Sequence, residues 1–246
     1  MMIITRSKMS QFHYNDWIRY FKKNNEHRLN IDFSKESVLM PEDRILIQPS
    51  IRAFQRGEAS EGRNLMRLAE IFAVKTGEKD YKEAVRWFIK EENGHSSYLK
   101  KFMDYYRIRP STKSHLDYIF RAFRKLGSLK CEVTVLAAAE IIALTYYDAL
   151  SKSIDSPALK SICRQMLHDE LPHIIFQSYT LSHFPVRLRD KIFRIVLMGC
   201  TAVSVWAAFH EVYRAGGYNF RKYMWGNFNY LKQSIELSQK SQWKEA

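Results

Sequence analysis

The sequence has few of the residues that break or cross-link a chain. Its 246 residues include nine glycines, six prolines and three cysteines. This scarcity of helix breakers, together with few stretches of alternating polar and apolar residues, predicts a mostly helical protein. Cys131, Cys163 and Cys200 are odd in number and form no C-x-x-C pair, which argues against a disulfide framework or a zinc ribbon. We therefore expect an all-α protein in a reducing cytoplasm.

Long apolar runs are also scarce. The N-terminus carries charged and aromatic residues instead of an apolar signal core, which argues against secretion. Residues 195–209 hold no charge, but fifteen residues fall short of the ~20 that cross a bilayer. We expect no transmembrane span. The run is interpreted as a buried helix, with a membrane-surface or subunit-interface helix as the alternative.

Positive charge is abundant, with a formal net charge of +13 that suggests an anionic partner. Residues 100–130 hold nine Lys or Arg against Asp104 and Asp117. This basic stretch could hold an anionic carrier, a carrier-bound or phosphate-bearing substrate, or an electron donor. The alternative is a solvated face that only aids solubility.

Apolar residues recur at helical spacing in four long segments. These core helices are predicted at 44–75, 80–106, 129–153 and 157–183. We divide the chain into an N-terminal arm (1–44) with an amphipathic helix at 10–23, a four-helix bundle (45–184), and a C-terminal extension (185–246). The extension begins with a helix at 188–214 and packs on the bundle or at a subunit interface, as in a homodimer.

Two short motifs, E-E-N-G-H and H-D-E-L-P-H, carry the chemistry. Each places a glutamate three residues before a histidine, as Glu92 with His95 and Glu170 with His173. Because residues three apart are stacked on one face of a helix, both side chains of a pair can reach one metal ion. The alternative is a set of surface acids beside ordinary histidines.

Each motif carries a further acid. Glu91 and Asp169 lie four residues before His95 and His173, where a helix places them to accept the outer N–H of a ligating imidazole. Pro172 interrupts the second motif, and a proline inside a helix costs about 3 kcal/mol. It predicts a kink or π-bulge that redirects His173, or a His173 that is not a ligand.

Single acids interrupt the apolar faces of the other two core helices. Glu140 lies in a run that is almost free of charge, and both Glu58 and Glu61 lie on the first helix. An unpaired buried carboxylate is costly, so such acids indicate a metal or a base nearby. Glu61 is preferred as the ligand because it precedes Glu92 by 31 residues, much as Glu140 precedes Glu170 by 30. Glu58 is then a supporting or channel residue.

Together these residues form the ligand set of a di-metal site in a four-helix bundle. The predicted ligands are Glu61, Glu92, His95, Glu140, Glu170 and His173. A carboxylate-rich set with one imidazole per ion suits iron or manganese, and we expect two iron ions or an iron–manganese pair. Tyr98, Tyr147 and Tyr179 are candidate redox or pocket residues, with core packing as the alternative.

The pattern resembles the ferritin-like di-iron carboxylate superfamily, which includes rubrerythrins, ferritins, acyl carrier protein desaturases and the ribonucleotide reductase small subunit. The likeness covers residues 44–184, and the E-E-N-G-H motif followed by Leu99, Lys101 and Phe102 is locally most similar to the desaturases. The resemblance implies a ferritin-like bundle with additional C-terminal helices. It also implies an oxidoreductase that activates dioxygen, of hydroxylase, oxygenase or desaturase type, on an unknown substrate.

Two other functions are compatible with the sequence. The first is a ferroxidase or peroxide-scavenging iron protein, although no rubredoxin-like cysteine cluster is present to deliver electrons. The second is a non-enzymatic helical binding module that uses its basic face, for which no nucleic-acid recognition motif is found.

Overall fold

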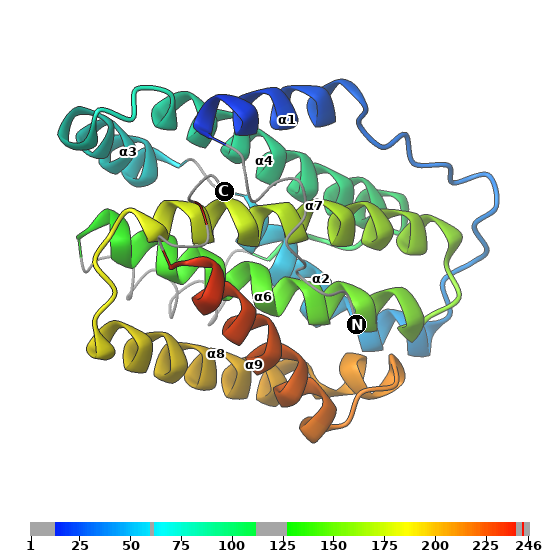
Figure 1. Cartoon of the computed structure of the whole chain (residues 1–246). Coiled ribbons are helices and arrows are strands. Elements are labelled where there is room, and N and C mark those ends of the chain that lie inside the picture. Colours follow the sequence, from blue (N-terminus) through cyan, green and yellow to red (C-terminus); the bar gives the residue numbers. More distant parts are fainter. Residues whose placement is uncertain (1–12, 60–61, 112–126, 240–242, 244–246) are drawn as a thin grey trace.

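The computed structural model describes residues 13–59, 62–111, 127–239 and Trp243. This part of the chain consists of helices and their connections and contains no strand. The all-α prediction is confirmed. The helices run side by side in layers, and α8 and α9 cover one side of α6 (Figure 1).

The helix bounds agree with the expected core segments, apart from the first. The helices are α1 (Tyr14–Glu26), α2 (Pro41–Glu58), α3 (Arg63–Thr76), α4 (Tyr81–Tyr105), α6 (Leu129–Ser153), α7 (Pro157–Ser182), α8 (Leu188–Ala215) and α9 (Phe220–Leu237). Local capping explains two of the starts. The Ser128 hydroxyl accepts the Cys131 N–H at 3.2 Å, and the Ser156 hydroxyl accepts the Leu159 N–H at 3.1 Å.

The continuous helix predicted at 44–75 is wrong. The chain forms α2 and α3 instead, and Gly62 between them has a left-handed backbone with a φ of 61°. Glycine alone takes this conformation without strain, and a Cβ at Gly62 would collide with the side chain of Ile89. Glu61 lies outside the described residues, so the 31-residue spacing on an unbroken helix no longer favours it over Glu58.

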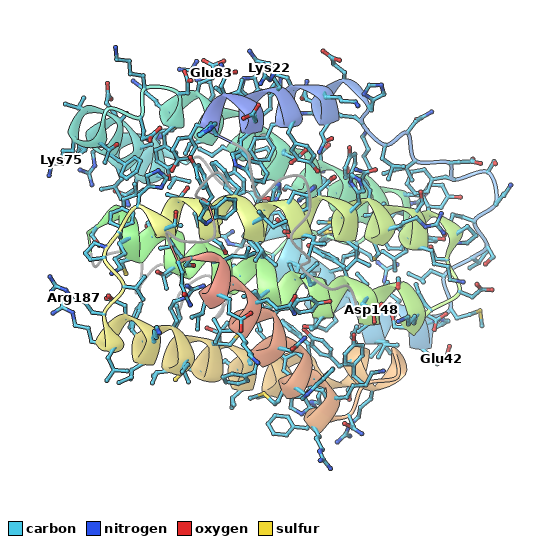
Figure 2. All side chains as sticks on the ribbon, viewed as in Figure 1. Lys22, Glu42, Lys75, Glu83, Asp148 and Arg187 are labelled. Atoms are coloured by element: carbon cyan, nitrogen blue, oxygen red, sulfur yellow. The ribbon has the colours of Figure 1, made fainter. Side chains whose placement is uncertain are left out.

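The layers enclose one hydrophobic core to which every labelled helix contributes. The α6 and α7 helices pack along each other, α4 contacts α2 and α7, and α1 lies on α4 (Figure 1). The N-terminal arm thus packs against the bundle, with Trp17 and Phe21 buried. Side chains fill the space between the helices, while charged residues such as Lys75 and Arg187 lie at the periphery (Figure 2).

Among the described residues, α6 and α8 are long and apolar enough to cross a membrane by length and composition. Most of the apolar window of α6 (89%) is buried inside the protein, as in the core helix of a folded domain. Only 33% of the corresponding window of α8 is buried. Much of the apolar window of α8 therefore faces outward.

Candidate metal centre

Two helices bring the paired glutamates and histidines together. Glu92 and His95 of α4 and Glu170 and His173 of α7 are all buried, and one ligand atom from each lies within 4.8 Å of the others. Among the described residues this is the one group of acids and histidines with the geometry to hold a metal ion. The two motifs therefore form a single centre.

Each imidazole turns its Nδ1 atom toward both glutamates. Nδ1 of His173 lies 3.0 Å from Oε1 of Glu92 and 3.4 Å from Oε2 of Glu170. Nδ1 of His95 lies 3.4 Å from Oε1 of Glu170 and 3.6 Å from Oε1 of Glu92. The carboxylates thus lie between the two rings, where each can be shared between two ions.

Glu140 adds a third helix to the centre. It is buried on α6, and its Oε2 lies 3.9 Å from Nδ1 of His173. Burial raises the pKa of Glu140, and the charges of Glu92 and Glu170 raise it further. The near-charge-free run of α6 therefore places its carboxyl beside His173.

Glu58, the last residue of α2, is a further buried carboxyl. The Tyr147 hydroxyl donates to its Oε1 at 2.5 Å. Burial raises the pKa of Glu58, and so do the charges of Glu92 and Glu170, which places Glu58 within electrostatic range of the cluster. The sequence assigned this residue a supporting role, and the choice between Glu58 and Glu61 as a ligand stays a prediction because Glu61 lies outside the described residues.

Two further acids lie at hydrogen-bond distance from the Nε2 atoms of the two imidazoles. Nε2 of His95 lies 3.1 Å from Oδ2 of Asp169, and Nε2 of His173 lies 2.8 Å from Oε2 of Glu91. The predicted pairing of each acid with the histidine of its own helix is wrong, because the pairs cross between α4 and α7. When Nδ1 faces the centre, Nε2 on the opposite edge of the ring faces the neighbouring helix.

Asp169 has additional partners. Gln165 donates to its two oxygens at 3.0 and 2.9 Å, and Nδ1 of His168 lies 2.9 Å from Oδ1. Burial by itself raises the pKa of Asp169, but the hydrogen bonds from His168 and His95 outweigh it and lower the pKa well below its usual range. Asp169 is therefore ionised. Sequence reasoning missed Gln165, although it lies four residues before Asp169 on the same helix face.

Opposing effects set the proton distribution at the centre. Burial would raise the pKa of Glu170 and lower the pKa of His95 and of His173. Attraction between the closely spaced carboxylates and imidazoles reverses both effects, so the pKa of Glu170 falls and those of the histidines rise.

Pro172 does not redirect its neighbour. The α7 helix is helical from Pro157 to Ser182, and no π-bulge interrupts it. His173 reaches Glu91 with one ring nitrogen and Glu92 with the other. The structure shows no π-bulge at Pro172, and His173 lies within the cluster.

Apolar rings cover His173. The Phe88 ring lies 4.9 Å and the Phe21 ring 5.9 Å from the His173 ring, measured between centroids. The N-terminal helix α1 therefore forms part of the wall of the centre. Because these apolar rings exclude water, they strengthen the electrostatic interactions at the centre.

The three candidate tyrosines have different surroundings. Tyr147 holds Glu58, as described above. Tyr98 lies 6.5 Å from His95 between ring centroids, and its hydroxyl accepts the Leu29 N–H at 3.0 Å. Tyr179 packs against Tyr14 and His183 rather than against the cluster.

A small cavity lies on the outer side of His95. Its volume is about 20 Å³, and Asn24, Arg28, Tyr98 and Asp169 are among the residues that line it. Such a volume holds about one water molecule. A water bound in this cavity would be separated from the centre by the His95 ring.

Residues 112–126 of the predicted docking stretch at 100–130 lie outside the described residues. In the described part, Nζ of Lys100 pairs with Asp104 of its own helix at 2.7 Å, and Nζ of Lys130 pairs with Asp190 at 2.6 Å. A docking role for this stretch stays a prediction.

The donor atoms fit a metal. Five buried polar atoms of the described residues have no hydrogen-bond partner and belong to this one cluster: Oε1 of Glu92, Nδ1 of His95, both carboxylate oxygens of Glu170 and Nδ1 of His173. A buried polar atom without a partner costs about 1–3 kcal/mol. A cation at the centre satisfies all five at once.

Fold and site define an all-helical protein with a buried carboxylate–histidine cluster that can hold a metal ion. Comparison with protein-family models, with curated proteins and with solved structures gives no match. The function is therefore argued from the geometry of the cluster.

Proposed function

We propose that the cluster binds two metal ions, either iron or an iron–manganese pair, and that the protein is a dioxygen-activating oxidoreductase of the ferritin-like di-iron type. The observation that carries the proposal is the set of five unpartnered buried atoms around one centre. The proposed ligands are Glu58, Glu92, His95, Glu140, Glu170 and His173. Glu61 stays a prediction of the sequence.

Charge supports two ions rather than one. Two divalent cations carry four positive charges, which the four proposed carboxylates balance while both imidazoles are neutral. Each imidazole offers a single Nδ1 to the centre because its Nε2 faces Asp169 or Glu91. One histidine per ion with shared carboxylates is the donor set of iron and manganese sites rather than of copper sites.

The chain contributes orientation and exclusion of water. Asp169 and Glu91 fix the rings so that Nδ1 faces inward, and Tyr147 holds one oxygen of Glu58. Phe21 and Phe88 keep bulk water away from His173. A reduced iron pair would supply the electrons that dioxygen accepts. The expected reaction class is hydroxylation, oxygenation or desaturation, and the substrate and the electron donor are left open.

The test is iron loading followed by oxygen. Protein loaded anaerobically with Fe(II) should consume dioxygen and develop a transient visible absorption on mixing with air. His173→Ala should abolish both signals, whereas His27→Ala, which removes an exposed histidine that contacts the Lys23 carbonyl, should retain them. If protein with full iron occupancy neither consumed dioxygen nor developed the absorption, the oxidoreductase proposal would be contradicted.

One observation favours ferroxidase or peroxide chemistry as a second candidate. The cavity beside His95 has a volume of about 20 Å³, which suits an iron ion, dioxygen or peroxide better than an organic substrate. A ferroxidase should oxidise many added Fe(II) ions per chain without an external reductant. An oxygenase should stop after the resident pair is oxidised. Native mass measurement separates the two further, because storage requires a large hollow assembly.

A further inference from the structure

The outward face of α8 is as apolar as its inward face. Between Arg194 and His210 the helix carries no charge, and Leu188 in its first turn is 75% exposed. The exposed residues of this charge-free part are apolar or small: Ile195, Val196, Cys200, Val203, Ala207 and Ala208. In Figure 1, α8 forms one outer edge of the molecule. An outer helix of a folded domain would normally present charge here.

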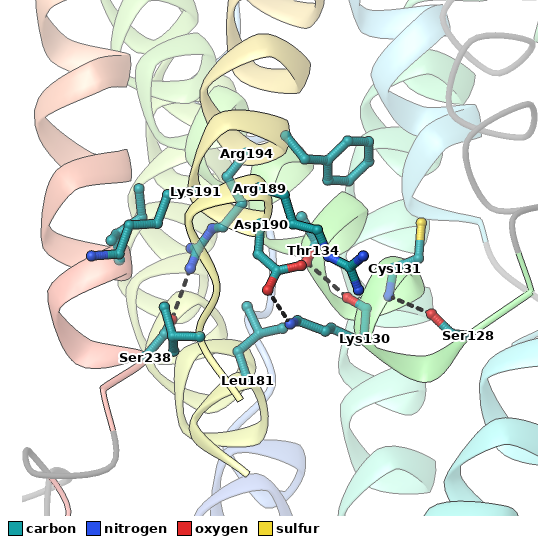
Figure 3. A pocket seen from close by; sticks show the side chains of 13 residues that line it. Ser128, Lys130, Cys131, Thr134, Leu181, Arg189, Asp190, Lys191, Arg194 and Ser238 are labelled. Carbon is teal, nitrogen blue, oxygen red and sulfur yellow. Dashed lines mark hydrogen bonds and ion pairs between the residues drawn. The ribbon is translucent and has the colours of Figure 1, made fainter. Parts of the chain in front are cut away.

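A pocket of about 250 Å³ lies beside the N-terminal turns of this helix, between α6, α7, α8 and α9 (Figure 3). Four cations line it, namely Lys130, Arg189, Lys191 and Arg194, against the single carboxylate of Asp190. Lys130 already pairs with that carboxylate at 2.6 Å. The pocket therefore has a surplus of positive charge.

Arg194 is the most informative of the four cations. It is only 7% exposed, and its guanidinium donates to the hydroxyls of Ser238 at 2.9 Å and Ser234 at 2.7 Å. No carboxylate of the described residues pairs with it. Burial lowers the pKa of Arg194 to about 10, so the group stays charged at neutral pH. A buried cation held only by neutral hydroxyls is costly unless an anion reaches it.

We propose that the first turns of α8 bind an anionic phospholipid of a membrane surface. The phosphate enters the cationic pocket, and the acyl chains lie along the exposed apolar face that begins at Leu188 and Ile192. The helix lies in the plane of the surface, because its opposite face, including Leu197 and Val205, is buried against the protein. This proposal does not depend on the metal centre.

The net positive charge of the chain favours an anionic membrane over a second copy of the chain as the partner of this face. Two chains that each carry a net charge of +13 repel each other, whereas an anionic bilayer attracts the chain. Each Lys or Arg near an anionic surface strengthens binding by roughly fivefold. Buried apolar side chains add to this attraction, as in other helices that lie at a membrane surface.

The experiment is sedimentation of the full-length protein with vesicles of neutral phosphatidylcholine or of phosphatidylcholine with phosphatidylglycerol. Binding is expected only to the anionic vesicles and should weaken as salt is raised. The double substitution Arg189→Gln with Lys191→Gln should weaken binding roughly twentyfold or more. Ile195→Glu should reduce it at least tenfold, whereas Val74→Glu, which changes an exposed valine of α3, should leave it unchanged.

The remaining outcomes overturn the proposal. Equal binding to neutral and anionic vesicles would exclude a headgroup site. Thermal stabilisation by inorganic phosphate without vesicle binding would identify a free-anion pocket. Concentration-dependent dimerisation that Ile195→Glu abolishes, without vesicle binding, would assign the face to a second copy. Circular dichroism of each variant shows whether it is folded, so that a loss of binding is read only from folded protein.

Discussion

Nε2 of His95 on α4 lies 3.1 Å from Oδ2 of Asp169 on α7, and this contact decides which ring nitrogen faces the cluster. Because an ionised carboxylate accepts the Nε2 proton, Nδ1 is directed toward Glu92 and Glu170. The reciprocal contact of His173 with Glu91 acts in the same way from the other helix. The two crossed bonds fix the rotation of α4 against α7 and the orientation of both rings.

Asp169→Asn should weaken metal binding by roughly 10- to 100-fold, the usual effect of losing a carboxylate that orients a ligating histidine. The amide keeps the shape of the side chain but removes the charge that holds the Nε2 proton. Competition of a chromophoric chelator for Fe(II) or Mn(II) measures the affinity. Asp155→Asn is the matched control, because Asp155 is exposed and pairs with Lys160. A change of less than threefold at Asp169 would contradict the orienting role.

Glu58→Gln should lower the number of tightly bound ions per chain, whereas Glu61→Gln should leave it unchanged. Glu58 is buried at the cluster, and Tyr147 holds one of its oxygens. The amide keeps the volume but cannot supply a charged ligand. Anaerobic equilibrium dialysis followed by elemental analysis counts the ions. The opposite pattern would show that Glu61 supplies the ligand, as the spacing argument proposed.

Metal should stabilise the wild-type protein strongly and the Glu140→Gln variant weakly. Metal at a thousandfold excess over its dissociation constant adds about 4 kcal/mol to the free energy of unfolding. For a chain of this size, that is a rise of roughly 8–16 °C in the melting temperature. The metal-free variant should melt within a few degrees of the metal-free wild type, because an amide replaces a buried carboxyl of the same shape. Differential scanning calorimetry with and without Mn(II) measures both, and an equal rise in both proteins would remove Glu140 from the ligand set.

Metal affinity should increase with pH. Burial, together with the charges of Glu92 and Glu170, raises the pKa of Glu58 and of Glu140, so protons occupy these carboxyls at pH values where a free carboxyl is ionised. A metal must displace those protons, so acid opposes binding and binding releases protons. Calorimetric titrations in two buffers of different ionisation enthalpy count the protons. A binding constant that is flat across the acidic range, with no protons released, would contradict this account.

Local rules were sufficient for much of the fold. Ser156 followed by Pro157 marks the start of α7, and the scarcity of glycine leaves α4 and α6 uninterrupted. The break between α2 and α3 could not be predicted in the same way. It depends on the left-handed backbone of Gly62 beside Ile89, and that contact joins segments 27 residues apart in the sequence.

Local spacing predicted part of the site, and the rest depends on contacts between helices. Glu92 with His95 and Glu170 with His173 were predictable, because three-residue spacing fixes a shared helix face whatever the tertiary structure. The crossed partnership of Asp169 and His95 depends on the rotation of one helix against another, which no local spacing encodes. The ranking of Glu61 above Glu58 relied on an unbroken first helix, and α2 ends at Glu58, so the spacing argument no longer separates the two residues.

The most direct test of the metal centre is an anaerobic titration of metal-free protein with Fe(II), in which bound and free iron are separated and counted. The account predicts saturation at two ions per chain for the wild type, and loss of tight binding in Glu170→Gln. Absence of saturable binding in folded wild-type protein would contradict it, because the five unpartnered atoms at the centre would then have no cation to satisfy them.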